Sequence, residues 1–159
     1  MIVEQRLTEL GLVLPATIQV PEGIVLPFSF VRVHGKKAYI SGHGPQNPDG
    51  TVAGPFGKIG DTITVEQGYD AAQSTALSIL GSLKRELGSL DRVTAWLRVF
   101  GMVNSAPDFT QQPLVINGFS DLILALYGKE QGAHSRSAVG MVALPFNICV
   151  EIEAEVEIE

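Results

Sequence analysis

The C-terminal segment of this chain alternates strictly between apolar and acidic side chains. Five apolar residues alternate with five glutamates over the last ten positions: Val150, Glu151, Ile152, Glu153, Ala154, Glu155, Val156, Glu157, Ile158 and Glu159. Successive side chains of a β-strand point to opposite faces, so this period of two predicts a strand with all five glutamates on one face of a sheet. The chain is therefore expected to build a sheet with one apolar face and one polar face.

Other local patterns predict the elements around this strand. Thr64 with Gln67 three residues later forms a capping box that begins a helix, and Ser105 with Pro107 resembles a second helix start that Pro113 kinks or delays. The expected elements in chain order are a helix over 3–11, strands over 29–33 and 37–41, a helix over 64–88, a strand over 93–103, a helix over 105–128, and strands over 135–142 and 148–158. The glycine-rich loop over 41–60 is long enough to suggest a functional role.

The order β-β-α-β-α-β-β after an N-terminal helix predicts an α/β (α+β) fold, a two-layer sandwich with helices on one face of the sheet. The 159 residues, without repeat or linker, fit one domain over 1–159. Mean hydropathy is +0.23 and only 18% of residues are charged, so part of the apolar surface is expected to be covered by other subunits.

The composition also disfavours several classes of partner. The net charge of −6 repels polyanions, which argues against nucleic acid. Neither a signal peptide nor a membrane span is visible, so a cytoplasmic location is expected, and the lone Cys149 cannot form an internal disulfide. The three histidines lack metal-ligand spacing. His43 is interpreted as a histidine of a surface loop, and the alternative is that it carries protons in the site.

Several segments resemble the Rid/YjgF family, also called the endoribonuclease L-PSP family. These are Arg136-Ser137-Ala138-Val139, Leu144-Pro145, Val150-Glu151-Ile152-Glu153, Ile40-Ser41-Gly42 and Ile116-Asn117. The resemblance covers roughly residues 27–156 and implies a chorismate mutase-like fold with a mixed sheet. It also implies a homotrimer whose sheets form an inner barrel, with three sites in the clefts between subunits. RidA members hydrolyse 2-aminoacrylate and related enamines or imines to a 2-keto acid and ammonia, without a metal or cofactor.

The resemblance also assigns roles to individual residues. Arg136 matches the arginine that holds the substrate carboxylate, a task suited to the planar guanidinium fork. Glu151 matches the glutamate that positions the attacking water and can pass a proton. Ser41 and Gly42 match a segment that offers backbone contacts to the ligand, and Asn117 matches a helix asparagine near the site.

Three departures from the RidA pattern suggest a divergent subgroup. Phe28 replaces a usual tyrosine, Ala138 replaces a frequent cysteine, and the loop over 45–60 is longer than usual. These changes predict a more apolar pocket that could accept another ligand. Each of the two main residues also has a non-functional interpretation. Arg136 could pair with a local glutamate, and Glu151 could be one of a row of solvent-exposed glutamates on the sheet face.

The leading hypothesis is a cofactor-free enamine or imine deaminase that acts on a small carboxylate-bearing substrate. A non-catalytic trimer that binds small carboxylic metabolites is the second hypothesis, and it requires Arg136 but not Glu151. A ribonuclease is the third, and the acidic balance together with the absence of a His/Lys catalytic pair argues against it.

Overall fold

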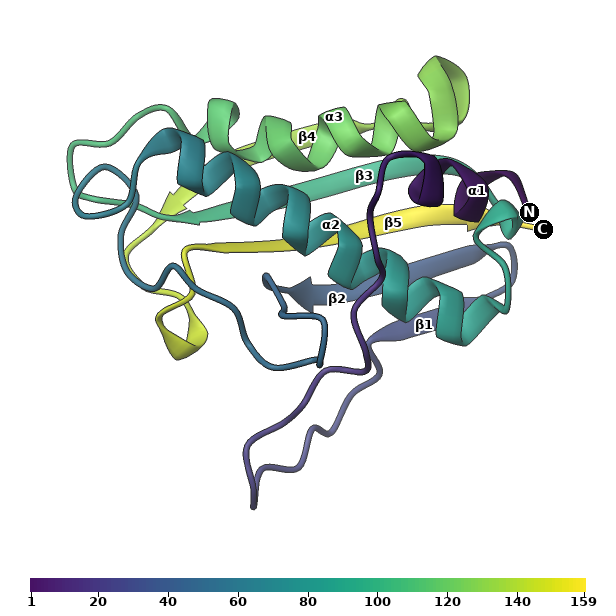
Figure 1. Ribbon diagram of the computed structural model, residues 1–159, viewed down its shortest axis with the longest axis horizontal. Coiled ribbons are helices and arrows are strands. Elements are labelled where there is room, and N and C mark those ends of the chain that lie inside the picture. Colours follow the sequence, from purple (N-terminus) through teal and green to yellow (C-terminus); the bar gives the residue numbers. More distant parts are fainter.

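The computed structural model describes residues 1–159 as a five-stranded mixed sheet with its helices on one face (Figure 1). The elements in chain order are α1 (Ile2–Glu9), β1 (Val31–His34), β2 (Lys37–His43), α2 (Val65–Leu87), η1 (Leu90–Arg92), β3 (Val93–Asn104), α3 (Gln112–Gln131), β4 (Ser135–Met141), η2 (Pro145–Asn147) and β5 (Val150–Ile158). Every predicted helix and strand is present, and the predicted two-layer α+β fold is confirmed.

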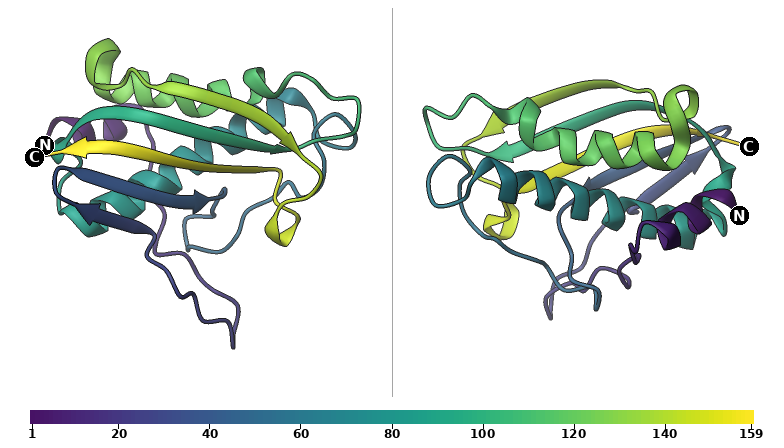
Figure 2. Two further views of the ribbon diagram at one scale, coloured as in Figure 1. Left: turned by 180° about the vertical axis from the view of Figure 1, so that it is seen from behind. Right: turned by 45° about the horizontal axis from the view of Figure 1, so that its top comes forward.

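The sheet order is β1-β2-β5-β3-β4, so the last strand inserts between the first hairpin and β3. Only β3 and β4 run parallel, and the other neighbouring pairs are antiparallel. On β5 the apolar residues are buried while every glutamate is at least partly exposed, as the alternation predicts. Figure 2 shows the face of the sheet that no helix covers. The glutamate row lies on this bare face.

The core lies between the sheet and the two long helices. Helix α2 begins at the predicted capping box, with Thr64 Oγ1 accepting from Gln67 N at 3.1 Å and Gln67 Oε1 accepting from Thr64 N at 2.9 Å. The helices approach closely at Gly118, where a β-carbon would stand 2.0 Å from the carbonyl oxygen of Tyr69. Trp96 on β3 packs edge-on against Phe119 of α3. This close packing fixes α3 against β3 and β4, and therefore fixes the side chains at that edge.

The predicted start of the second long helix is wrong. Helix α3 begins at Gln112, because the chain after β3 stays extended: Ser105 forms a bridge with Ile59, and Ala106 N donates to the Ile59 carbonyl at 3.0 Å. The residue before Pro107 is also disfavoured in helical conformation. Pro113 lies in the first turn of α3, where proline is tolerated, so the delay of the helix is confirmed and the kink is not.

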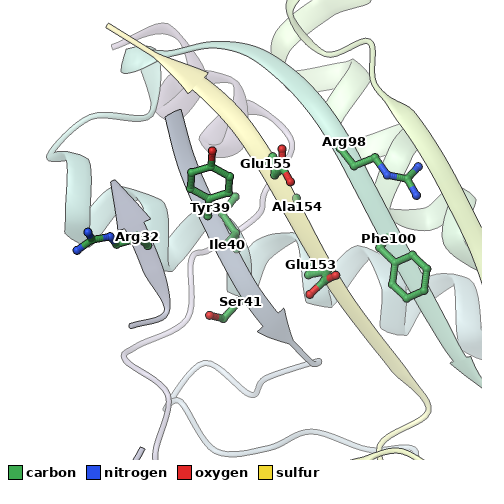
Figure 3. Close-up of a pocket in the computed structure, with 9 residues that line it drawn as sticks. All are labelled: Arg32, Tyr39, Ile40, Ser41, Arg98, Phe100, Glu153, Ala154 and Glu155. Carbon is green, nitrogen blue, oxygen red and sulfur yellow. The ribbon is translucent and has the colours of Figure 1, made fainter. Parts of the chain in front are cut away.

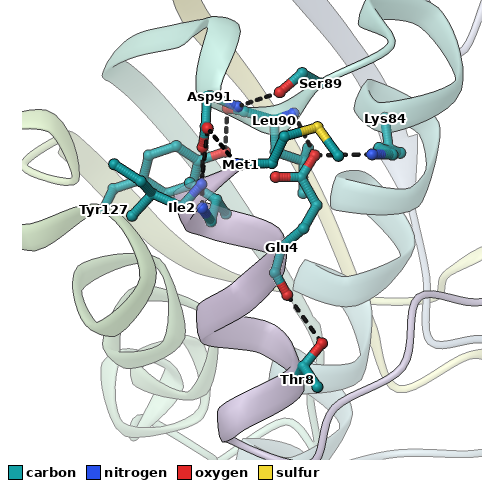
Figure 4. A network of polar contacts seen from close by, with 10 residues as sticks. Met1, Ile2, Glu4, Thr8, Lys84, Ser89, Leu90, Asp91 and Tyr127 are labelled. Carbon is teal, nitrogen blue, oxygen red and sulfur yellow. Dashed lines mark hydrogen bonds and ion pairs between the residues drawn. The ribbon is translucent and has the colours of Figure 1, made fainter.

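Helix α1 packs at the end of the sheet near both termini through a polar network (Figure 4). Glu4 accepts from Lys84 Nζ at 2.9 Å and from Leu90 N at 3.0 Å. The Asp91 carboxylate accepts from the backbone N–H groups of Ile2 and Val3 at 2.7 and 2.9 Å, which are the free donors of the first helical turn. The N-terminal helix is thus joined to α2 and η1 by charge-assisted hydrogen bonds.

The chain between α1 and β1 forms an irregular segment, residues 16–28, which we call the strap. It extends beyond the sheet at the bottom of Figure 1. Gln19 N donates to the carbonyl of Gly50 at 3.0 Å, and Ala16 N donates to that of Pro48 at 2.9 Å. Gly50 has φ +90°, and a β-carbon there would stand 2.2 Å from the carbonyl oxygen of Thr17. The long loop after β2 therefore holds the strap in place.

Candidate active site

A bulge near the end of β2 brings Gly42 against Glu151. Ile40 pairs with Ala154 and His43 pairs with Ile152, so two residues of β2 oppose one residue of β5. A β-carbon on Gly42 would stand 2.1 Å from Oε2 of Glu151. Glycine is therefore required for the carboxylate to occupy this position. Phe28, Gly42 and Glu151 line one pocket, and we call these three residues the carboxylate half-site.

The Glu151 carboxylate has no hydrogen-bond partner within the chain. Burial raises the pKa of Glu151, and the nearby charge of Glu153 raises this pKa further. A carboxylate with a raised pKa is a better proton acceptor than an ordinary surface glutamate, and it exchanges protons closer to neutral pH. Perturbed carboxylates of this kind are typical of functional pockets. In contrast, Glu153 is exposed, so the two glutamates of the row occupy different environments.

An aromatic wall borders the carboxylate half-site. The rings of Phe28 and Phe30 meet edge-on at 6.1 Å between centroids, and Phe30 meets His43 at 5.7 Å. The interpretation of His43 as a surface histidine is wrong, because its side chain is buried. Its Nδ1 lies 2.6 Å from the Ser41 carbonyl and its Nε2 lies 2.8 Å from Ser82 Oγ. Burial lowers the pKa of His43 to about 4, so the ring is neutral and structural.

Ser41 lies beside the carboxylate half-site rather than in it. Its hydroxyl donates to the Ser29 carbonyl at 2.7 Å, and its backbone N donates to the Phe30 carbonyl at 2.9 Å. The side chain lines a neighbouring hollow on the bare face, together with Arg32 and Glu153 (Figure 3). Ser41 therefore fixes the chain before β1, which carries Phe28 to the pocket.

A second cluster forms where α3 packs over β4. Arg136 Nη1 donates to Asn117 Oδ1 at 2.9 Å and to Ser120 Oγ at 3.1 Å, and Nη2 lies 3.4 Å from the Pro113 carbonyl. No carboxylate lies within ion-pair distance of Arg136, so the alternative of a local glutamate partner is wrong. We call Arg136, Asn117 and Ser120 the arginine half-site. The side-chain Nε of Arg136 has no partner and Nη2 has one long contact, so one edge of the guanidinium is available to a ligand.

Ser120 and His134, which orient Arg136, were not predicted from the sequence. His134 Nδ1 lies 2.7 Å from the Gly132 carbonyl, so that nitrogen carries the proton, and Nε2 lies 2.9 Å from Ser120 Oγ and accepts from the hydroxyl. The Ser120 oxygen then presents lone pairs to Arg136. Ser120 follows Asn117 at helical spacing, so the shared helix face was the one available signal.

The two half-sites do not meet within one chain. In the sheet, Arg136 on β4 pairs with Val99 on β3, and Val99 pairs with Ala154 on β5. The side chains of Val99 and Ala154 are buried under the helices, so the side chain of Arg136 lies on the helix side of the sheet. Glu151 pairs with Met102 and faces the opposite side. The α-carbons of Arg136 and Glu151 are separated by two strand spacings and three residues along the strands, which is about 14 Å. Ala138 lies two residues beyond Arg136 on the same face of β4, opposite Gly101.

No group of three or more His, Cys, Asp or Glu side chains is placed to hold a metal ion. None of the helices combines the length and the apolar character that crossing a membrane requires.

The similarity of this chain to known proteins extends over nearly its whole length. A family model for YjgF/chorismate mutase-like proteins matches residues 4–156. Protein TCP17 of Trypanosoma cruzi is 40% identical over 156 residues, which cover 98% of this chain and 94% of that protein. The structure of Atu1372 from Agrobacterium tumefaciens superposes with a TM-score of 0.89 at 38% identity, over 99% of this chain and 93% of that chain. RidA from an Antarctic Psychrobacter superposes with a TM-score of 0.56 at 23% identity, over 90% and 99%, a likeness that shows the fold alone.

Proposed function

Because this chain belongs to the YjgF/chorismate mutase-like family, as a subgroup divergent from RidA, we propose that it hydrolyses reactive enamines or imines to a 2-keto acid and ammonia. The observation that carries the proposal is the Glu151 carboxylate, which has no partner in the chain, has a raised pKa, and lies against Gly42 in a pocket. A row of purely structural glutamates gives no reason for Glu151 to lie half-buried in this pocket against Gly42 while Glu153 on the same strand face is exposed. No cofactor is needed for the reaction.

Glu151 acts as acid and base in turn. It accepts a proton from water as the oxygen adds to the imine carbon, and it passes this proton to the nitrogen to give a carbinolamine. It then accepts the proton of the new hydroxyl group and passes it to the nitrogen as the carbon–nitrogen bond breaks and the carbonyl group forms. The products are a 2-keto acid and ammonia, so water is the only other reactant. An enamine such as 2-aminoacrylate first takes a proton on its terminal carbon and becomes the imine.

Arg136 holds the substrate carboxylate. Its Nη1 is fixed by Asn117 and Ser120, which leaves the edge formed by Nε and Nη2 for two parallel hydrogen bonds to a carboxylate. The bonds to α3 restrain the side chain before the ligand arrives, so less conformational freedom is lost on binding.

A complete site requires two copies of the chain. Arg136 and Glu151 point to opposite sides of the sheet and are too far apart for one small substrate. We therefore place each site in a cleft of a homotrimer, with the arginine half-site of one subunit facing the carboxylate half-site of the next. Light scattering should give three times the mass of one chain, and a monomer at micromolar concentration would contradict this assembly.

Mixed trimers test the shared site directly. Arg136→Ala and Glu151→Gln should each be inactive alone, but a cleft that joins the intact arginine of one subunit to the intact glutamate of its neighbour should work. Random mixing in a closed ring with one cleft per subunit pair should restore about a quarter of the wild-type activity. If a verified mixed trimer recovers no activity, either both residues belong to a site within one subunit or they do not share a site, and the proposed arrangement is refuted.

The principal assay is ammonia release from 2-aminoacrylate or a small 2-imino acid generated in situ. The protein should accelerate release above the spontaneous rate, and the absence of acceleration by a folded trimer would refute the deaminase. Retained binding of 2-keto acids in that case would favour the non-catalytic trimer. An endoribonuclease has less support, since the polar bare face carries a row of glutamates that would repel RNA.

A further inference from the structure

The pocket beside Glu151 is largely apolar. It has a volume of about 360 Å³, and Glu151 supplies its acidic group. The strap forms one wall, and the turn that contains Pro145 and Phe146 forms another. The apolar side chains that matter most are Ile24, Leu26, Phe28, Phe30, Phe146 and Ile148. A single carboxylate against apolar walls suits a ligand with a polar end and an apolar end.

Several of these apolar side chains are not packed into the core. The exposed fractions of Ile24, Phe28 and Phe146 are 46%, 55% and 59%. Each could lose a large apolar area from water when a ligand enters, which is favourable in proportion to that area. Other large apolar side chains are exposed elsewhere on the surface, but these three come from separate segments of the chain and meet at one pocket.

Phe146 is held in an unusual backbone conformation. Its φ is +58° and its ψ is 17°, and Asn147 follows with φ +57°. Bulky residues rarely adopt this left-handed region, which costs free energy unless the surroundings enforce it. Asn147 N donates to the Leu144 carbonyl at 3.1 Å, and the Asn147 carbonyl accepts from Gly57 N at 2.9 Å. The turn is thus enforced, yet the Phe146 ring remains mostly exposed, so core packing does not explain its position.

The opposite wall is fixed as well. The strap is anchored through the hydrogen bonds of Ala16 and Gln19 to the loop after β2, described above. Phe28 at its end packs edge-on against Phe30, which packs in turn against the buried His43. The two ends of the strap are therefore positioned before a ligand binds, which reduces the cost of ordering this wall.

We propose that this pocket binds the side chain of the substrate, so that the protein prefers 2-imino acids with branched or aromatic side chains over 2-aminoacrylate and the alanine-derived imine. The inference rests on the proposed function for the identity of the reacting group. In this arrangement the substrate carboxylate lies on Arg136, the imine carbon lies near Glu151, and the apolar side chain lies between Phe28 and Phe146.

Calorimetric titration of the trimer with two stable 2-keto acids tests the inference without requiring turnover. The probes are pyruvate and 4-methyl-2-oxopentanoate, which differ by three carbon atoms in the side chain. We expect the larger acid to bind about tenfold more tightly, since part of its added apolar area is removed from water. Equal affinities, or tighter binding of pyruvate, would overturn the inference.

Matched variants assign the preference to the pocket wall. Phe146→Ala should reduce the affinity ratio of the two acids to about threefold or less, because one wall is lost. Phe56→Ala is the control, since Phe56 has a similar exposed fraction of 50% and does not line this pocket. It should leave the ratio unchanged. A ratio that is unaffected by Phe146→Ala, together with a smaller mass in light scattering, would make Phe146 a subunit contact and would overturn its role in binding.

The outcomes separate this inference from the proposed function. A preference for the larger keto acid without any imine hydrolysis would refute the deaminase and leave the apolar specificity standing. Hydrolysis of the imines derived from alanine and from leucine with equal efficiency, together with equal keto acid affinities, would refute only the specificity.

Discussion

Gly42 and Glu151 are in such close contact that a β-carbon at position 42 would stand 2.1 Å from the carboxylate oxygen Oε2. The bulge in β2 thus determines where the proposed acid–base group lies. Gly42→Ala should displace that carboxylate. The sheet should remain folded, because Gly42 lies in the bulge and is not one of the residues that pair β2 with β5. We expect turnover to fall by about tenfold or more, because proton transfer depends on position.

The control for this change is Gly44→Ala. A β-carbon there would meet the flexible end of Ile148 at 2.7 Å rather than a carboxylate. Gly42 lies near the end of β2 and Gly44 lies just beyond it, so both variants add one methyl group at the same end of the strand. Because Ile148 lines the apolar pocket, Gly44→Ala should change KM more than kcat. Equal losses of kcat at matched thermal stability would attribute the Gly42 effect to general disturbance of this segment.

Arg136→Lys should weaken the binding of 2-keto acids by about tenfold or more, since the charge is kept and the two parallel hydrogen bonds are lost. Titration calorimetry measures this directly. Arg98→Lys is a suitable control, because Arg98 is exposed on the bare face and donates to Ser137 at 3.2 Å. Unchanged affinity in Arg136→Lys would remove the arginine from the site.

Ser120→Ala should loosen Arg136 without removing it. The hydroxyl links His134 to the guanidinium, and one such hydrogen bond contributes enough free energy to change affinity about fivefold. We expect KM to rise while kcat changes little, and Ser120→Thr should restore KM. A purely structural role predicts a lower melting temperature with kinetic constants unchanged.

The fold followed from local patterns, but the site followed only in part. The alternation in β5 and the capping box at Thr64 were sufficient to predict the sheet layer and the helix layer, because both patterns depend only on residues that are close together in the chain. Helix α3 was started too early because Ser105 forms a bridge with Ile59, a contact between distant segments. The burial of His43 under Ser82 and the separation of Arg136 from Glu151 likewise depend on strand order, which local patterns do not determine.

His43 should make folding stability depend on pH. Its folded-state pKa of about 4 lies below the ordinary value of 6.5, so between these values the unfolded chain binds a proton that the native state rejects. The stability is fully present above about pH 6.5 and is lost as pH falls toward 4. Urea unfolding at pH 7 and pH 5 should differ by about 2 kcal/mol from this group.

His43→Gln should remove most of that difference, while His34→Gln should not, since the His34 side chain is exposed and makes no hydrogen bond. An unchanged pH dependence in His43→Gln would show that other groups cause it.

The comparison of Glu151→Gln with Glu153→Gln tests the central claim most directly. The two glutamates lie on the same strand two residues apart, but only Glu151 lines the pocket with Gly42. Burial in this pocket raises the pKa of Glu151. Glutamine keeps the size of the side chain and cannot accept the proton, so kcat for imine hydrolysis should fall by about 10² or more in Glu151→Gln. The affinity for a stable 2-keto acid should change little, and Glu153→Gln should retain most of its turnover. Small and equal effects at both positions would contradict the account and identify the glutamate row as structural.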